Sequence, residues 1–213
     1  MKNIYVEGNI GTGKTTFLKY LEQHLPSDKY NFIYEPVDEW MRTTDDSGKS
    51  ILEHFYEDQS KWSYCFQMNS FISRIHKITE TNRANPGKIN IIERSVFTDD
   101  ICFAKNCLES GDMRSLEYNV YKKWHTWLTD KFDIQSDAFI YLYSSPEVCS
   151  QRIAKRSRSG ESGIPIEYLE NLHRRHDEWL NTEKNVLKIE SEENMYDNES
   201  KMKNIIERIE KLY

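Results

Sequence analysis

The sequence predicts an α/β fold in which a five-stranded parallel sheet is covered by helices on both faces. Short apolar stretches alternate along the chain with longer segments of helical spacing, which is the order expected for a parallel sheet. The first apolar stretch runs directly into a glycine-rich loop of the kind that holds phosphate groups. No Pro/Gly/Ser-rich linker and no repeat divides the 213 residues, so we expect one domain over residues 1–213.

The glycine-rich loop begins at Gly8 and fits the pattern G-x-x-x-x-G-K-[ST] in full. Its glycines allow a tight turn whose N–H groups face inward, and the helix expected at 16–21 adds its positive end. Lys14 should reach the β- and γ-phosphates of ATP, and Thr15 should offer its hydroxyl to Mg²⁺. We therefore expect the three-layer fold of P-loop nucleotide hydrolases. The residues expected to bind ATP here are Gly8, Asn9, Ile10, Gly11, Thr12, Gly13, Lys14, Thr15 and Thr16.

The composition favours a small-molecule partner. The net charge of −6 argues against a surface that coats nucleic acid. Four cysteines without C-x-x-C spacing favour free thiols in a reducing compartment, so neither disulfides nor zinc are expected. The chain enters its first strand without a signal core or transit stretch, and no apolar run approaches the length of a membrane span. We expect a cytoplasmic enzyme with no nucleic-acid partner and no membrane partner.

Each expected strand is a short run rich in β-branched and aromatic residues. The second strand is stopped by Pro36. Because parallel strands all point the same way, Glu35 after the second strand and Glu93 after the third should meet the phosphate loop at one edge of the sheet. The strands are expected at 3–6, 30–34, 88–92, 138–143 and 186–189.

The helices between the strands are recognised by apolar residues at helical spacing. In the longest of them, Gln67, Ser70 and Arg74 share one face, and a polar stripe in a mostly apolar helix indicates a lined cavity. A polar loop is expected at 41–50. Helices are expected at 50–56, 61–81, 100–108, 114–129, from 147 onward, at 165–181 and around 205–212.

Glu35, Glu93 and Arg94 are the candidate catalytic residues. Glu35 could accept a proton from a hydroxyl that attacks the γ-phosphate, or it could be a solvated loop carboxylate. Glu93 occupies the place where phosphate-loop enzymes hold an acidic group near the metal. Arg94 could hold the hydroxyl or the transferring phosphoryl group, or it could form a structural ion pair.

Arg152, Arg156 and Arg158 precede a tract rich in Ser and Gly. This pattern fits a mobile lid, at about 152–165, that brings guanidinium groups over the transferring phosphate of ATP. A basic run can also be a solvated helix face, but in a chain with a phosphate loop we favour the lid. His173 and His176 lack an acidic partner at metal-ligand spacing, so we expect surface or packing histidines.

Several short blocks, spread almost from end to end of the chain, form one pattern. They are Glu7-Gly8-Asn9-Ile10, Glu35-Pro36-Val37 with Trp40, Phe66-Gln67, Ser73-Arg74, Glu93-Arg94-Ser95-Val96 with Asp99, and Gly163-Ile164-Pro165 with Tyr168-Leu169. In this order they closely resemble the deoxyribonucleoside kinases of the deoxycytidine, deoxyguanosine and mitochondrial thymidine kinase group. The resemblance implies ATP-dependent phosphorylation of a deoxyribonucleoside 5'-hydroxyl to the 5'-monophosphate, in nucleotide salvage. It also implies a homodimer formed through the long helices.

The resemblance assigns roles to the matched residues. It implies that Glu35 is the general base for the 5'-hydroxyl, that Arg94 holds this hydroxyl, and that Glu93 helps to place Mg²⁺. It further implies that Tyr56 and Glu161 bind the 3'-hydroxyl. It also implies that Gln67 pairs with the edge of the base and that Phe66 and Phe103 sandwich the base ring. The walls of the pocket would be Trp40, Leu52 and Phe55.

Ser70, Arg74 and Asp99 bear on the preferred base. Arg74 with Asp99 resembles the deoxycytidine and deoxyguanosine branch, whereas the thymidine branch has apolar residues in their place. A thymine methyl group would meet a desolvated ion pair, while an amino group or ring N–H would suit the carboxylate. Ser70 resembles the deoxyguanosine kinase-like members. We therefore expect purine deoxynucleosides to be preferred, then deoxycytidine, and thymidine last.

One residue and one segment fit the family pattern less well. Asp100 stands where the family often has Arg. The segment Glu192-Glu193-Asn194-Met195 resembles the family's acidic loop against the donor base in part of its pattern.

Three rival hypotheses remain. A nucleoside monophosphate kinase, resembling thymidylate kinase, would share the fold but would need a basic site for the acceptor's phosphate, where Glu35 repels it. A GTPase switch would need an N-K-x-D motif, which the sequence lacks. A non-catalytic nucleotide-binding protein would have no reason to keep Lys14, Thr15, Glu35 and Arg94 together.

Overall fold

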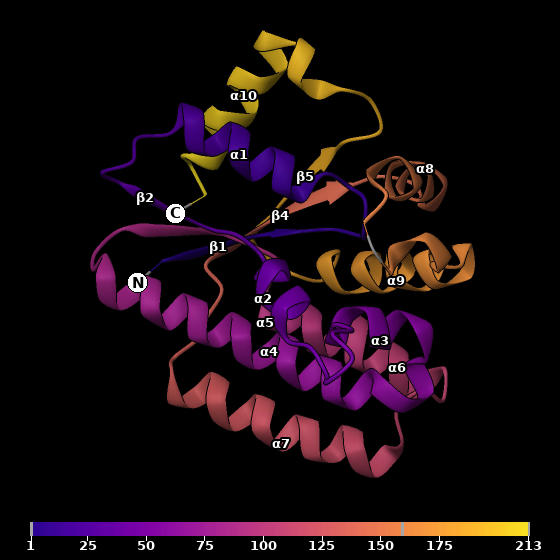
Figure 1. The fold of residues 1–213 in the computed structure, drawn as a ribbon. Coiled ribbons are helices and arrows are strands. Elements are labelled where there is room, and N and C mark those ends of the chain that lie inside the picture. The colour runs from indigo at the N-terminus through magenta and orange to yellow at the C-terminus, as the bar shows by residue number, and fades with distance from the viewer. Residues whose placement is uncertain (1, 159, 213) are drawn as a thin grey trace.

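The sheet is built from five parallel strands in the order β2-β3-β1-β4-β5, as Figure 1 shows near the middle of the molecule. The computed structural model describes residues 2–158 and 160–212. The predicted α/β fold with a five-stranded parallel sheet is confirmed. The strands are β1 (Asn3–Glu7), β2 (Tyr30–Ile33), β3 (Ile89–Glu93), β4 (Ala138–Tyr143) and β5 (Val186–Glu190).

Helices occupy most of the chain between the strands. Short 3₁₀ turns, η2 (Glu161–Gly163) and η3 (Met195–Asp197), follow α8 and β5. The helices are α1 (Lys14–His24), α2 (Val37–Arg42), α3 (Ile51–Glu57), α4 (Gln59–Ala84), α5 (Val96–Thr98), the π-helix η1 (Asp99–Ala104), α6 (Lys105–Glu109), α7 (Ser115–Lys131), α8 (Pro146–Arg156), α9 (Ile166–Leu180) and α10 (Glu199–Ile209).

The sheet separates two hydrophobic cores. Alternate residues of a strand point to opposite faces, so in β1 the side chains of Ile4 and Val6 enter one core and that of Tyr5 enters the other. The first core lies under α1 and α10, and the second lies under α4, α7 and α9, on the opposite face of the sheet in Figure 1. Both faces of each inner strand are therefore buried, as expected for a parallel sheet.

A row of buried asparagines fixes the register of three strands. Asn31, Asn90 and Asn3 face one another across β2, β3 and β1. The Asn90 amide accepts from Asn31 at 2.9 Å and donates to Asn3 at 2.8 Å and to Asn82 of α4 at 2.7 Å. Sliding one strand by a residue would break this chain of hydrogen bonds inside a buried layer, where unpaired amides are costly.

The helical segment after β3 differs from the prediction of one helix at 100–108. A continuous helical run extends from Val96 to Glu109, and its middle, Asp99–Ala104, is a π-helix. The Ser95 side chain begins the run by accepting a hydrogen bond from the Thr98 N–H at 3.1 Å. π-helical turns are rare and occur frequently at functional sites.

The prediction of a polar loop at 41–50 was wrong for its first two residues. Met41 and Arg42 belong to α2, which has acidic residues in its first turn and Arg42 in its last, as the helix dipole favours. A helix of six residues is too short to show a periodic pattern. Strand β2 ends at Ile33, so Tyr34 lies beyond it.

Among the described residues, no helix combines the length and the apolar character needed to cross a membrane.

Replacing Asn90 with Ala should destabilise the fold strongly. The change leaves the Asn31, Asn3 and Asn82 amides without their partner in a buried layer, which we expect to cost about 2 to 4 kcal/mol of unfolding free energy. Equilibrium unfolding in urea measures this. The matched control is Asn204→Ala on the exposed face of α10, which should change stability by less than about 0.5 kcal/mol. Equal effects of the two changes would contradict a structural role of the asparagine row.

Candidate functional site

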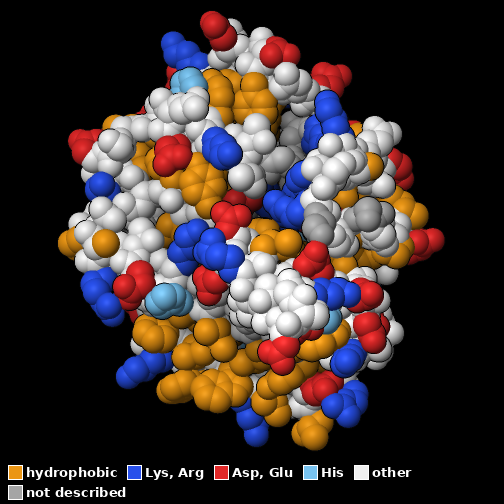
Figure 2. All heavy atoms as spheres, in the orientation of Figure 1, with side chains coloured by type: hydrophobic (Ala, Val, Ile, Leu, Met, Phe, Trp, Pro, Cys, Tyr) orange, Lys and Arg blue, Asp and Glu red, His pale blue; other side chains and the backbone are white. Residues whose placement is uncertain are grey.

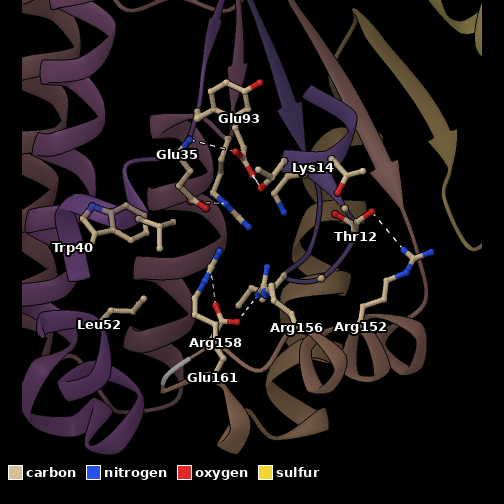
Figure 3. A pocket seen from close by; sticks show the side chains of 18 of the residues that line it. Thr12, Lys14, Glu35, Trp40, Leu52, Glu93, Arg152, Arg156, Arg158 and Glu161 are labelled. Carbon is tan, nitrogen blue, oxygen red and sulfur yellow. Dashed lines mark hydrogen bonds and ion pairs between the residues drawn. The ribbon is translucent and has the colours of Figure 1, made fainter. Parts of the chain in front are cut away.

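A cavity of about 780 Å³ opens at the carboxyl ends of the strands. Figure 3 shows Trp40 and Leu52 on one side of Glu35, and Thr12 and Arg152 beyond Lys14 on the other. Its size and mixed lining suit a small molecule with a polar and an apolar end. The predicted site residues that line it are Ile10, Gly11, Thr12, Gly13, Lys14, Thr15, Thr16, Glu35, Trp40, Leu52, Phe55, Tyr56, Phe66, Gln67, Ser70, Arg74, Glu93, Arg94, Asp99, Phe103, Arg152, Arg156, Arg158 and Glu161.

Gly8 and Asn9, which we expected among the ATP-binding residues, do not line the cavity. Gly8 has a φ of 143°, and a Cβ at this position would lie 2.4 Å from the carbonyl oxygen of Leu142 in β4. The Asn9 amide donates to the carbonyl of Leu169 at 2.8 Å and accepts from the N–H of Ile10 at 2.9 Å. These two residues therefore hold the phosphate loop against β4 and α9.

Lys14 lies under the loop with its ammonium group buried. Its Nζ donates to the carbonyl oxygens of Gly8 at 3.0 Å and Asn9 at 2.6 Å. Burial, and then the nearby guanidinium of Arg94, lower the pKa of Lys14 to about 7. An anion bound in the loop would therefore meet a lysine that titrates close to neutral pH.

Thr15 and Glu93 form a compact pair of oxygen ligands. The Thr15 hydroxyl donates to Glu93 Oε1 at 2.5 Å, and Glu93 Oε2 lies 3.4 Å from the N–H of Glu35. Within residues 2–158 and 160–212, no group of three or more His, Cys, Asp or Glu side chains could hold a metal by itself. A hydroxyl with one carboxylate fits Mg²⁺, which usually takes its other ligands from phosphates and water.

The Arg74 guanidinium joins three parts of the site. It donates to Asp99 Oδ2 through Nε at 2.9 Å, to Glu35 Oε1 through Nη2 at 2.9 Å, and to the carbonyl of Glu93 through Nη1 at 3.1 Å. Ser70, one turn earlier on α4, donates to Asp99 Oδ1 at 3.3 Å. The predicted stripe on α4 is thus confirmed as a cavity wall, and its arginine orients a carboxylate at the end of β2.

Glu35 lies between two guanidinium groups. Arg94 Nε is 3.1 Å from Glu35 Oε1, the same oxygen that Arg74 contacts. Burial by itself would raise the pKa of Glu35, but Arg94, Arg74 and Lys14 outweigh it and hold the pKa at about 2. This carboxylate is therefore ionised at any physiological pH.

Arg94 adopts an unusual backbone conformation for its position. Its φ is 65°, a left-handed value that a non-glycine residue rarely adopts. The guanidinium is buried with its carbon 4.7 Å from the centre of the Phe103 ring, and its Nη1 has no hydrogen-bond partner among the described residues. Backbone strain of this kind is typical of functional sites.

Aromatic rings form the apolar end of the cavity. Phe55 and Phe66 stack with centroids 4.5 Å apart, and Trp40 meets Phe66 edge-on at 5.4 Å. The Trp40 indole N–H donates to the hydroxyl of Ser73 at 2.9 Å. The Gln67 amide is buried among them, and within the described part of the chain its one hydrogen-bond contact is weak, 3.9 Å from its nitrogen to the sulfur of Cys107.

The lid arginines are engaged by an acidic residue. Arg156 and Arg158 both contact the buried carboxylate of Glu161, at 2.5 and 3.0 Å, as Figure 3 shows. Arg152 instead donates to backbone carbonyls, including that of Ser191 at 2.6 Å. The arginines therefore reach the cavity, but they belong to two separate networks. Residue 159, within the predicted lid, lies outside the described residues.

The structure also lines the cavity with residues that sequence analysis missed. Lys19 follows Thr15 by one helical turn, and this spacing could have identified it. Of the expected donor-base segment, Glu193, Asn194 and Met195 line the cavity, whereas Glu192 accepts a hydrogen bond from the N–H of Ser145 at 2.6 Å. The other missed lining residues are Tyr34, Val37, Asp38, Ser191 and Tyr196.

Comparison with known proteins gives one consistent family. A family model described as deoxynucleoside kinase matches residues 4–213. Deoxycytidine kinase 2 of Gallus gallus is 36% identical over 84% of this chain and 74% of its own length. Deoxycytidine kinase 1 of Xenopus laevis is 33% identical over 98% of this chain and 89% of its own length. The mitochondrial deoxyguanosine kinase of Xenopus laevis is 33% identical over 92% of this chain and 79% of its own length.

ATP binding should take up protons above neutral pH. Lys14, with a pKa of about 7, is mostly neutral at about pH 8.5, and bound phosphates would raise its pKa and protonate it. Calorimetric titration in buffers of different ionisation enthalpy measures this uptake. Below about pH 7 the lysine is already charged, so affinity should be greatest there and fall as the pH rises.

The control for this experiment is Lys14→Arg, because a guanidinium stays protonated throughout this range. Zero proton uptake by the unmodified protein at about pH 8.5 would contradict the lowered pKa of Lys14.

Proposed function

Because the chain belongs to the deoxynucleoside kinase family, we propose that Glu35, Arg94 and the phosphate loop together transfer the γ-phosphate of ATP to the 5'-hydroxyl of a deoxynucleoside. The chain is a deoxynucleoside kinase, and this family implies ATP as the phosphate donor. One observation carries the assignment of roles. An ionised, partly buried carboxylate, that of Glu35, shares a single cavity with the phosphate-loop lysine.

Glu35 receives the proton of the attacking hydroxyl. With a pKa near 2 it is a weak base, so it takes the proton only as the new bond to phosphorus forms and the hydroxyl becomes acidic. Until then the Glu35 carboxylate orients the hydroxyl by accepting a hydrogen bond from it. Arg94 Nη1, which has no hydrogen-bond partner in residues 2–158 and 160–212, supplies a donor close to the same place.

The transferring phosphate is held by positive charge and by main-chain N–H groups. Lys14 leaves its two loop carbonyls to contact the β- and γ-phosphates, and Arg156 and Arg158 reach in from the lid at 152–165. Thr15 and Glu93 would hold Mg²⁺, which would neutralise charge on the phosphates. Positioning and electrostatics account for most of the catalysis in phosphoryl transfer.

The deoxyribose binds between Tyr56 and Glu161. Burial, and then the charge of Glu161, raise the pKa of Tyr56 well above its usual value, so the phenol keeps its proton and acts as a donor. Glu161 accepts from the 3'-hydroxyl while it also holds Arg156 and Arg158. Recognition of the sugar is thereby tied to the arginines that face the phosphate.

The base lies in the aromatic end, with Gln67 on its edge and Phe66 and Phe103 on its faces. The amide of Gln67 supports this assignment because, among the described residues, it has only a weak contact with sulfur. The pair of Arg74 and Asp99 then favours purine deoxynucleosides, with deoxycytidine next and thymidine last. The similar proteins are named for both a pyrimidine and a purine deoxynucleoside, so this order is our proposal.

Two copies of the chain pair through α4 and α7. Leu116, Trp124 and Trp127 of α7 and Ile72 of α4 are exposed, with 73% of Leu116 and 54% of Trp127 accessible. Figure 2 shows hydrophobic side chains gathered on the lower part of the molecule, where Figure 1 places α7. Exposed apolar patches rimmed by charged residues are typical of protein interfaces.

The composition that favours free thiols also supports a cytoplasmic location.

Trp127→Glu should convert the dimer to a monomer, because it places a charge within an apolar interface. Sedimentation velocity measures the change. Lys203→Glu, on the exposed face of α10, is the control and should leave the dimer intact. An unmodified protein that is monomeric at micromolar concentration would contradict the proposed homodimer.

Glu35→Gln should reduce turnover by about 10² to 10⁴-fold, because the amide keeps the shape of the carboxylate and loses its basicity. Steady-state kinetics with ATP and a deoxynucleoside measure turnover, and equilibrium titration should show nucleoside binding largely retained. Glu39→Gln, an exposed change on α2 outside the cavity lining, is the matched control. Turnover within about threefold of the unmodified protein would remove Glu35 from the mechanism.

Values of kcat/KM for the four deoxynucleosides test the base preference. We expect deoxyguanosine and deoxyadenosine to be best and thymidine to be worst. Replacing Arg74 with Met together with Asp99 with Ala should raise thymidine activity relative to deoxycytidine, since the desolvated ion pair is removed. A clear preference of the unmodified protein for thymidine would refute this proposal.

A further inference from the structure

The π-helix η1 has one side in the cavity and another against α7. Asp99 and Phe103 line the cavity. Asp100, which directly follows Asp99, does not line it. Asp100 is nevertheless buried. Two adjacent carboxylates therefore enter the protein interior in different directions, and each needs its own positive partner because a buried unpaired charge is costly.

The partner of Asp100 comes from α7. Lys122 forms an ion pair with Asp100 Oδ2, and the hydroxyl of Tyr118, one turn earlier on α7, donates to Asp100 Oδ1 at 3.2 Å. His125, nearly one turn later, donates through Nε2 to the carbonyl of Val96 at 2.9 Å. Three positions on one face of α7 thus hold the start of the helical run that carries Asp99.

The partner of Asp99 is Arg74, at 2.9 Å. If the charge of Lys122 is lost, Asp100 is left buried without its ion-pair partner, directly beside Asp99 on the same helical turn. A π-turn holds one residue more than an α-turn, so it can relax by a shift of register that rotates a side chain by about 100°. Such a shift would move Asp99 relative to Arg74.

We propose that Lys122, together with Tyr118, is a positioning residue for base selectivity, holding Asp100 so that the π-helix keeps Asp99 paired with Arg74. This inference rests on the proposed function, in which the pair of Arg74 and Asp99 excludes thymidine. Neither α7 residue lines the cavity, so each acts through Asp100.

The test compares kcat/KM for thymidine with kcat/KM for deoxycytidine in Lys122→Met. We expect this ratio to rise roughly three- to tenfold, the range of mutations that act on a site through intermediate residues. Lys105→Met, an exposed lysine directly after the π-helix, is the matched control and should leave the ratio unchanged. Lys122→Arg keeps the charge and should restore the original ratio.

A second change separates positioning from general loss of stability. Asp100→Asn in the Lys122→Met background removes the unpaired charge, so it should return the ratio toward that of the unmodified protein. A purely structural role of Lys122 would lower the melting temperature without moving the ratio. If Lys122→Met does not fold, Tyr118→Phe removes one hydrogen bond to Asp100 and should move the ratio in the same direction.

The variant with Arg74→Met and Asp99→Ala separates this inference from the proposed function. If that variant fails to raise the thymidine ratio, the proposed base site is wrong and the positioning role falls with it. If that variant raises the ratio while Lys122→Met and Tyr118→Phe behave like Lys105→Met, the positioning role alone is overturned.

Discussion

The contact of Arg74 with both Glu35 and Asp99 is the interaction on which the site depends. The guanidinium is almost fully buried, and it uses three nitrogens on two carboxylates and the carbonyl of Glu93. A buried ion pair stabilises an arrangement only when each partner is fully hydrogen-bonded, because both ions have lost their water. Arg74 meets this condition, and it connects α4, the end of β2, the end of β3 and the π-helix. Loss of any of these partners would leave a buried charge that forces the others to move.

The parallel sheet makes this meeting possible. Strands β2, β3 and β1 are in register through their asparagine row, so Glu35, Glu93 and the phosphate loop emerge at the same edge. Three of the cations that face the cavity already have partners in this arrangement: Lys14 contacts loop carbonyls, and Arg156 and Arg158 contact Glu161. Substrate binding is therefore an exchange of partners, in which phosphates replace carbonyls around Lys14. Such an exchange couples binding to protonation.

The sequence predicted much of the fold and site because the relevant signals are local. The phosphate loop is a continuous motif, and the residues at strand ends follow from the direction of parallel strands. The structure adds a packing reason for a glycine at position 8, because its missing Cβ leaves room for the carbonyl of Leu142. The short helix α2 was missed because six residues give no period. The π-helix was missed because it differs from an α-helix by one residue per turn, and the pair of Asp100 with Lys122 joins segments that only the tertiary structure brings together.

The pKa of Glu35 tests most directly whether Arg74 and Arg94 hold this carboxylate in its ionised form. Carbon-13 NMR of the labelled carboxyl group, assigned with Glu35→Gln, reports this pKa. We expect a pKa near 2 in the unmodified protein, so that the resonance shows no titration above about pH 4, and a marked rise in Arg74→Met. Titration of Glu35 at the ordinary value of about 4.3 in the unmodified protein, unchanged by Arg74→Met, would contradict the account.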